Sequence, residues 1–127
     1  MRELEQLAAS AWHARQHAHV FGGTRVGCAI MAADGAIYAA CNVEHKFRSH
    51  DVHAEVNAIT SMVAAAGAQS VRYVVIVAER DYFTPCGACM DWIMQFGDGD
   101  TIVAFQNKKS GGFHEFRAAD LMPHYPK

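Results

Sequence analysis

The chain has 127 residues, 51% of them hydrophobic, so one domain of ordinary size can bury a core without disulfides. Its formal charge is −2 and Lys108-Lys109 is its only basic pair, which argues against a nucleic-acid groove or an anionic membrane as partner. No apolar run is long enough to span a membrane, and the N-terminus lacks the apolar segment of a signal peptide. We therefore expect a single domain, residues 1–127, in the cytoplasm, where the four cysteines favour a metal or redox site over a disulfide framework.

Apolar periodicity and turn residues divide the chain into helices and strands. The predicted elements, in chain order, are a helix over 3–18, strands over 26–31 and 36–40, a helix over 53–66, a strand over 71–78, a helix over 86–97, strands over 101–106 and 113–116, and a short helix over 118–121. Asp34-Gly35 favours a tight hairpin between the first two strands, Gly67 ends the second helix, and the polar segment 42–52 is predicted as a loop. This order predicts an α/β fold, a three-layer α/β/α sandwich around a mixed five-stranded sheet.

Two short stretches carry the chemistry, DVHAEV at residues 51–56 and TPCGAC at residues 84–89. Each lies where the chain enters a predicted helix, and the helix and strand between them return the chain to the same edge of the sheet. Cys86 and Cys89 are three residues apart, so one helical turn points both sulfurs the same way, as in thiolate pairs that hold Zn²⁺. With His53 as the third ligand, we expect one Zn²⁺ per chain with its fourth position open, as in catalytic zinc sites.

Glu55 supplies the second half of this chemistry. Two residues beyond His53, its carboxylate cannot share the direction of the ligand but can reach the space over the metal. A carboxylate in that place can take a proton from water activated by the metal and deliver it to a leaving group. His-x-Glu followed by Pro-Cys-x-x-Cys is the pattern of zinc-dependent nucleobase deaminases, and both halves occur here in that order. The sequence thus predicts Glu55 as the catalytic residue of a deaminase.

From residue 26 to about residue 126 the sequence resembles the small cytidine deaminases of the homotetrameric type, with blasticidin S deaminase as a near relative. The resemblance rests on HAE at 53–55, PCGAC at 85–89, VGCAI at 26–30, CNVE at 41–44 and ADLMP at 119–123. It implies a cytidine deaminase-like fold and the hydrolysis of cytidine or deoxycytidine to uridine or deoxyuridine and ammonia.

The resemblance also implies which residues bind the substrate. Asn42 and Glu44 stand where that family holds the ribose hydroxyls, which implies a free nucleoside. The N–H of Ala54 and the carbonyl of Thr84 stand where the base is hydrogen-bonded. Tyr125 is an approximate match to an aromatic residue that enters the site of a neighbouring subunit, so a homo-oligomer is expected, a tetramer by resemblance with a dimer as the alternative.

The sequence departs from the family pattern beside the metal and beside the base. The family usually has cysteine as first zinc ligand and arginine after the catalytic glutamate, where this chain has His53 and Val56. Three thiolates on Zn²⁺ leave a net charge of −1 that an arginine can offset, whereas one imidazole and two thiolates leave none, so Val56 is consistent with His53 as a ligand. Thr24 stands where the nucleoside enzymes usually have a phenylalanine, and Phe21 and Phe47 are the candidates to replace it.

Other interpretations stay open on the residues alone. A non-catalytic, structural zinc site needs a fourth ligand, which His50, three residues before His53, could supply. A redox-active Cys86–Cys89 pair would normally follow the first strand of its domain, whereas this pair comes late in the chain. Histidine as first ligand is usual in deaminases of nucleotides, guanine and nucleic acids, so the alternative substrate is another small aminated base or nucleoside, of blasticidin S, modified pyrimidine or guanine type.

Overall fold

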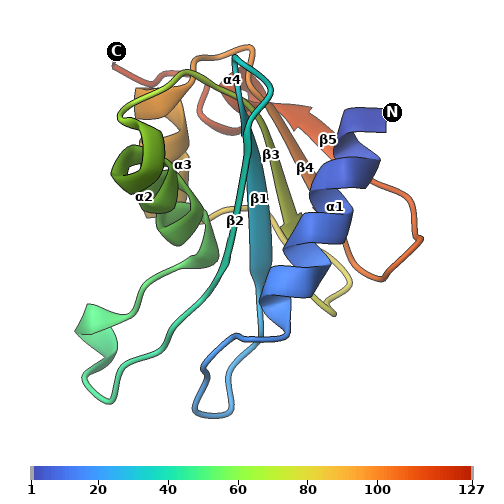
Figure 1. Ribbon diagram of the computed structural model, residues 1–127, viewed down its shortest axis with the longest axis vertical. Coiled ribbons are helices and arrows are strands. Elements are labelled where there is room, and N and C mark those ends of the chain that lie inside the picture. The colour runs from blue at the N-terminus through green and yellow to red at the C-terminus, as the bar shows by residue number, and fades with distance from the viewer. Residues whose placement is uncertain (1, 127) are drawn as a thin grey trace.

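The computed structural model describes residues 2–126, which form a mixed sheet between helices (Figure 1). The strands are β1 Gly27–Ala32, β2 Ile37–Cys41, β3 Val71–Val77, β4 Ile102–Gln106 and β5 His114–Arg117. They form one five-stranded sheet in the order β2-β1-β3-β4-β5, in which β3 and β4 are parallel and all other neighbours antiparallel. The predicted mixed five-stranded sheet is confirmed.

Helices cover both faces of this sheet. They are α1 Arg2–Arg15, α2 Ala54–Ala66, α3 Gly87–Phe96 and α4 Ala118–Leu121, with a 3-10 turn, η1, at Arg48–His50. Figure 1 shows α1 on one face and α2 and α3 together on the other. The predicted three-layer α/β/α arrangement is therefore confirmed. Within residues 2–126 we find no helix with the length and apolar character needed to cross a membrane.

Alternating side chains along the strands form a separate apolar core on each face. On β3, Val74 and Ile76 face α2 and α3, while Val75 and Val77 face α1. On the α1 face, Gly27 is in close contact with the helix, since a Cβ at this position would lie 2.1 Å from the carbonyl oxygen of Ala11.

The register of the sheet brings distant parts of the chain together at one end of the strands. Cys41 pairs with Gly27, Gly27 with Val77, and Val77 with Gln106. The segments that precede β1, follow β2 and follow β3 therefore meet at this end of the sheet, close to the start of both α2 and α3. In Figure 1 this is the lower end of the sheet.

Two segments differ from the sequence prediction. The first helix ends at Arg15, where residue 18 was predicted, because successive i→i+3 hydrogen bonds from the N–H groups of His17 and Ala18 turn the chain. The segment 42–52 is not simply a loop, since it contains η1 and a two-residue bridge between Val43 and Val52. The Asp51 carboxylate organises this segment by accepting from the N–H of His45 at 2.7 Å.

Candidate active site

The three predicted metal ligands come from the N-termini of two helices on one face of the sheet. His53 is the N-cap residue of α2, Cys86 is the N-cap residue of α3, and neither side chain makes a capping hydrogen bond. Cys89 lies one turn further along α3 and is fully buried. The Nδ1 atom of His53 is 3.2 Å from Sγ of Cys89 and 3.5 Å from Sγ of Cys86, and all three ligand atoms lie within 4.8 Å of one another.

This donor set fits Zn²⁺. Tetrahedral zinc with ordinary Zn–N and Zn–S bonds places nitrogen and sulfur ligands about 3.6 Å apart, close to the separations found here. Burial raises the pKa of the Cys89 thiol well above its usual range, and the negative charges of Glu55 and Cys86 raise it further. A divalent cation among these groups would remove that penalty and favour the thiolate form of both cysteines.

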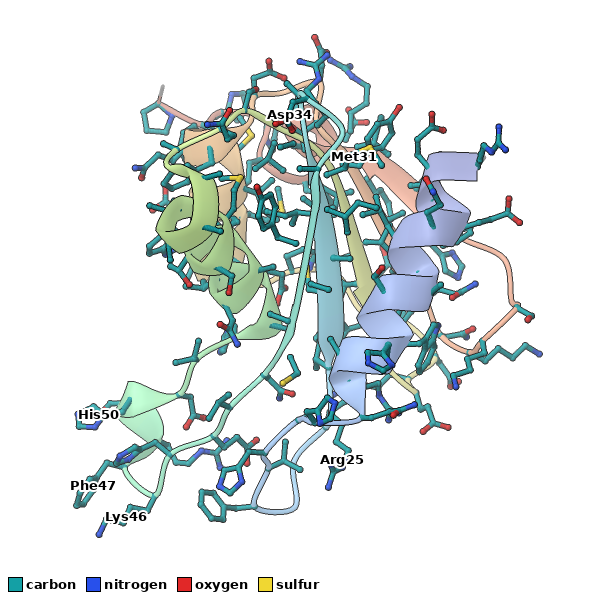
Figure 2. All side chains as sticks on the ribbon, in the orientation of Figure 1. Arg25, Met31, Asp34, Lys46, Phe47 and His50 are labelled. Carbon is teal, nitrogen blue, oxygen red and sulfur yellow. The ribbon has the colours of Figure 1, made fainter. Side chains whose placement is uncertain are left out.

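His50, the candidate fourth ligand of a structural zinc site, lies elsewhere. Within residues 2–126 the clustered ligands are His53, Cys86 and Cys89. The ring of His50 contacts the rings of His45 and Phe47, at 4.9 and 6.0 Å between centroids. Figure 2 shows Phe47 and His50 at the outer tip of the loop between β2 and α2, pointing away from the body of the protein. The three-ligand arrangement expected of a catalytic site is thus the one that the fold provides.

Glu55 lies in the first turn of α2 and is only 3% exposed. Burial is the main influence on its carboxyl group and raises its pKa above the usual value, while a hydrogen bond from its own backbone, the charge of His53 and a hydrogen bond with Cys89 act in the opposite direction. A raised pKa makes a buried carboxylate a stronger base, which suits a group that has to accept a proton and return it. Its contact with Cys89 places it beside the metal ligands.

A cavity of about 290 Å³ opens onto Glu55 and the ligands. It is lined by Thr24, Val26, Asn42, Glu44, His53, Ala54, Glu55, Phe83, Thr84 and Cys86. The lining includes every predicted metal, catalytic and substrate-binding residue except Cys89 and Tyr125. Cys89 is fully buried beside the other two ligands, and Tyr125 packs on α3, where its hydroxyl donates to the Asp91 carboxylate at 2.5 Å.

Asn42 and Glu44 have structural contacts in addition to their place in the cavity. The side chain of Asn42 accepts from the N–H of Val26 and donates to the carbonyl of Thr24, both at 2.9 Å. These bonds hold the segment before β1 against the end of β2. Each Asn42 amide atom can still make a second hydrogen bond to a ligand.

Glu44 is 8% exposed and holds the neighbouring loops together. It accepts from the N–H of Phe21 at 2.6 Å and pairs with the guanidinium of Arg48 at 3.1 Å. A Cβ at Gly23 would lie 2.3 Å from its carboxylate, so this glycine allows the two loops to approach. The carboxylate oxygens of Glu44 retain capacity to accept from a ligand hydroxyl.

The two positions predicted to bind the base, Ala54 and Thr84, also line the cavity. Ala54 is the first residue of α2, so its N–H has no acceptor within the helix. Thr84 lies in the segment that leads into α3.

The phenylalanines differ from the sequence-based expectation. Phe21 and Phe47 are 58% and 59% exposed, and neither lines the cavity. The phenyl ring in the lining belongs to Phe83, which the sequence reasoning missed. Its position directly before Thr84-Pro85-Cys86 was the available signal, but the path of that segment could not be read from the sequence.

A second cavity, of about 560 Å³, lies on the other face of the sheet between α1 and the segment 106–113. It contains none of the predicted site residues. Its polar lining includes Glu5, His13 and Lys109 from the two sides, without a cluster of metal ligands in the described part of the chain.

A mixed sheet with helices on both faces, and a three-ligand metal site with a buried glutamate beside its opening, together define the class of zinc-dependent deaminases. Comparison with known proteins gives the family within that class. The profile of the cytidine and deoxycytidylate deaminase zinc-binding region matches residues 1–105. The chain therefore belongs to the cytidine and deoxycytidylate deaminase family.

Individual relatives agree with this assignment. The chain is 35% identical over 123 residues to a cytidine deaminase of Sporosarcina psychrophila, covering 95% of this chain and 89% of the relative. It is 33% identical over 103 residues to a probable cytidine deaminase of Dictyostelium discoideum, covering 79% and 69%. The crystal structure of a cytidine deaminase from Burkholderia pseudomallei has the same fold, with a TM-score of 0.86 and 28% identity over 94% of this chain and 95% of that one.

Proposed function

We propose that the 127-residue chain forms one deaminase domain that hydrolyses the C4 amino group of a cytidine-type nucleoside, giving the uridine-type nucleoside and ammonia. One observation carries the proposal: Glu55, the open side of a three-ligand metal site, Asn42 and Glu44 all face the same cavity. A structural zinc site would leave the buried carboxylate and this cavity without a role.

In the proposed reaction the metal ligands and Glu55 have separate roles. When held by His53, Cys86 and Cys89, Zn²⁺ supplies the Lewis acidity that lowers the pKa of water toward neutrality. Glu55 accepts the proton that water loses as its oxygen bonds to C4 of the base. Glu55 then gives this proton to N3, takes a second proton from the new hydroxyl on C4 and delivers it to the amino group, which leaves as ammonia while a carbonyl forms at C4.

The rest of the cavity fits a free nucleoside. Asn42 and Glu44 are proposed to hold the sugar hydroxyls with the hydrogen-bonding capacity that their structural contacts leave. The N–H of Ala54 and the carbonyl of Thr84 are proposed to bind the base. A cavity of about 290 Å³ is at the small end for ligand sites, which favours a nucleoside over a larger ligand.

Another small aminated base or nucleoside, of blasticidin S, modified pyrimidine or guanine type, is the second candidate substrate. Thr24 lines the cavity, and its hydroxyl accepts from the guanidinium of Arg80 at 3.4 Å. This polar contact stands where the family resemblance implies an apolar ring, so the shape of the base subsite differs from the usual one.

We also infer from the family resemblance a homo-oligomer, with a tetramer favoured over a dimer. In that assembly Tyr125 would enter the site of a neighbouring subunit. The Tyr125 hydroxyl is bonded to Asp91 of its own chain, so this contact would be exchanged or shared when subunits meet.

Ammonia release by the zinc-loaded protein tests the proposed function. The panel is cytidine, deoxycytidine, cytosine, guanine, adenosine and blasticidin S. Release from cytidine and deoxycytidine is expected, and Glu55→Gln is expected to keep zinc and fold but lose turnover by roughly 10²–10⁴-fold or more. Release of ammonia from another compound of the panel alone would show that this compound, and not a cytidine-type nucleoside, is the substrate. Near-normal turnover in Glu55→Gln would contradict the proposed role of the glutamate.

A further inference from the structure

Phe83 lines the cavity together with Glu55 and two of the candidate metal ligands. It belongs to the segment between β3 and α3, one residue before Thr84 and three before the metal ligand Cys86, and it lines the cavity with both. Val26, Ala54 and Phe83 are the apolar residues of the lining, and Phe83 is the largest of them. A flat, aromatic ligand group near the metal ligands therefore has one extended apolar surface to lie against.

The ring of Phe83 is in contact with two neighbouring side chains. Its centroid is 5.8 Å from that of Phe105, a buried residue of β4, and the two rings are tilted by 40°. The guanidinium carbon of Arg80 lies 5.9 Å from the same ring. Such contacts restrict the motion of an aromatic side chain and reduce the entropy lost when a ligand binds.

Arg80 also joins the two segments that flank the cavity. Its guanidinium donates to the Thr24 hydroxyl at 3.4 Å, and Thr24 lies in the segment held by Asn42. Arg80 thus connects Phe83 to Thr24, a second residue of the cavity lining. This arrangement gives Phe83 a defined position relative to the residues proposed to hold the sugar.

We propose that Phe83 contacts the flat face of the substrate base and sets the affinity for it. This inference rests on the proposed function, because the atom attacked in deamination is part of the base ring. The ring must lie beside Glu55 and the metal ligands, which share the cavity wall with Phe83. The sugar extends toward Asn42 and Glu44, so truncation of Phe83 should weaken binding of the base without removing the groups that transfer protons.

Phe83→Leu tests this role against Phe83→Tyr. Leucine keeps an apolar side chain but removes the aromatic face, and the loss of one base–aromatic contact corresponds to roughly a tenfold or larger loss of affinity. We expect KM for cytidine and deoxycytidine to rise by about that factor in Phe83→Leu, with a much smaller change in kcat. Phe83→Tyr keeps the ring and should stay close to the unsubstituted protein.

Phe113→Leu is the matched control. Phe113 is another partly buried phenylalanine, but it packs against the core on the α1 face and lines the other cavity. It should lose some thermal stability and keep its KM. Melting temperature and zinc content, measured for all variants, separate a local effect on the substrate from a general loss of fold.

Binding without turnover provides the second measurement. In the Glu55→Gln background, the Kd of cytidine is measured by calorimetry with and without Phe83→Leu, and a weakening of roughly tenfold is expected. Unchanged KM and Kd in a zinc-loaded, folded Phe83→Leu protein would overturn the inference and leave the proposed function intact. Failure of the unsubstituted protein to release ammonia from any member of the panel would overturn the proposed function and this inference with it.

Discussion

At the scale of single residues, the clustering of His53, Cys86 and Cys89 beside Glu55 was predictable because much of its geometry is local. Cys86 and Cys89 are separated by one helical turn, and His53 and Glu55 belong to the same helix N-terminus. Spacing along the sequence therefore nearly determines spacing in the structure. The remaining condition, that the two helix ends meet, follows from the alternation of helix and strand between them.

Cys89 provides a direct test of the metal site. In Cys89→Ser we expect the zinc content to fall far below one per chain, because a hydroxyl is a poor zinc ligand and His53 and Cys86 remain as a two-ligand site. Metal analysis after gel filtration measures this loss. Cys41→Ser is the control, since Cys41 lies at the end of β2, outside the ligand cluster, and should retain full zinc. Full zinc content in Cys89→Ser would exclude Cys89 as a ligand.

Phe83 and the contacts of Glu44 could not be predicted in the same way. Glu44 bonds to the N–H of Phe21, which is 23 residues away along the chain. Phe83 lies in an irregular segment whose path depends on where α3 packs. Periodicity contains no information on such contacts, because they arise from the meeting of loops that have no repeating geometry.

At the scale of elements, the sequence predicted α2, α3 and the strands to within one or two residues of their ends. Gly67 and Gly97 mark the ends of α2 and α3. The end of α1 was placed three residues too late because Ala18 continues the helical spacing of apolar residues. Ala18 is indeed buried, at 5% exposure, but it reaches the interior from the turn that follows the helix. Burial and helical conformation are separate properties, and an apolar pattern reports burial alone.

The contact between α1 and β1 leads to a prediction at this scale. In Gly27→Ala the new methyl group would lie 2.1 Å from the backbone oxygen of Ala11, and neither strand nor helix can move without disturbing its own hydrogen bonds. We expect the free energy of unfolding to fall by about 3 kcal/mol, at the upper end for an overpacked site. Urea denaturation followed by far-UV circular dichroism measures it.

Gly112→Ala is the control for that variant. A Cβ at Gly112 meets no atom within 4 Å, and its backbone does not need the left-handed region, so stability should change little. If Gly27→Ala were as stable as Gly112→Ala, the helix would not be held at the distance that the structure gives.

At the scale of the whole molecule, the candidate active site and the core under α1 lie on opposite faces of the sheet. The metal ligands and Glu55 lie on the face covered by α2 and α3, and the other core lies under α1. The sequence predicted a layer of helices on each face. It did not predict which helix covers which face, because the apolar stripe of α1 would pack equally well on either side, and the choice depends on the direction in which the chain enters β1.

Gln106 tests how independent the two faces are. Its side chain points to the α1 face, where it accepts from the Trp12 indole at 2.7 Å and donates to the carbonyl of Gly111 at 2.8 Å. Gln106→Leu leaves the indole N–H of Trp12 and the carbonyl of Gly111 without their partner. Because an unpaired buried polar group is costly, we expect the free energy of unfolding, measured by urea denaturation, to fall by about 1–3 kcal/mol. Gln106→Glu keeps the acceptor for Trp12 and loses the donor to Gly111, so it separates the two bonds.

The same variants should keep the KM and kcat of the unsubstituted protein. Gln106 follows Phe105, whose ring supports Phe83 on the opposite face, so backbone movement at this point of β4 would reach the cavity. The pairing of Gln106 with Val77 holds that backbone in the sheet and should prevent such movement. A rise in KM that accompanies the loss of stability would show that the sheet transmits strain from one face to the other. Unchanged KM would show that α1 stabilises the fold without contributing to the site.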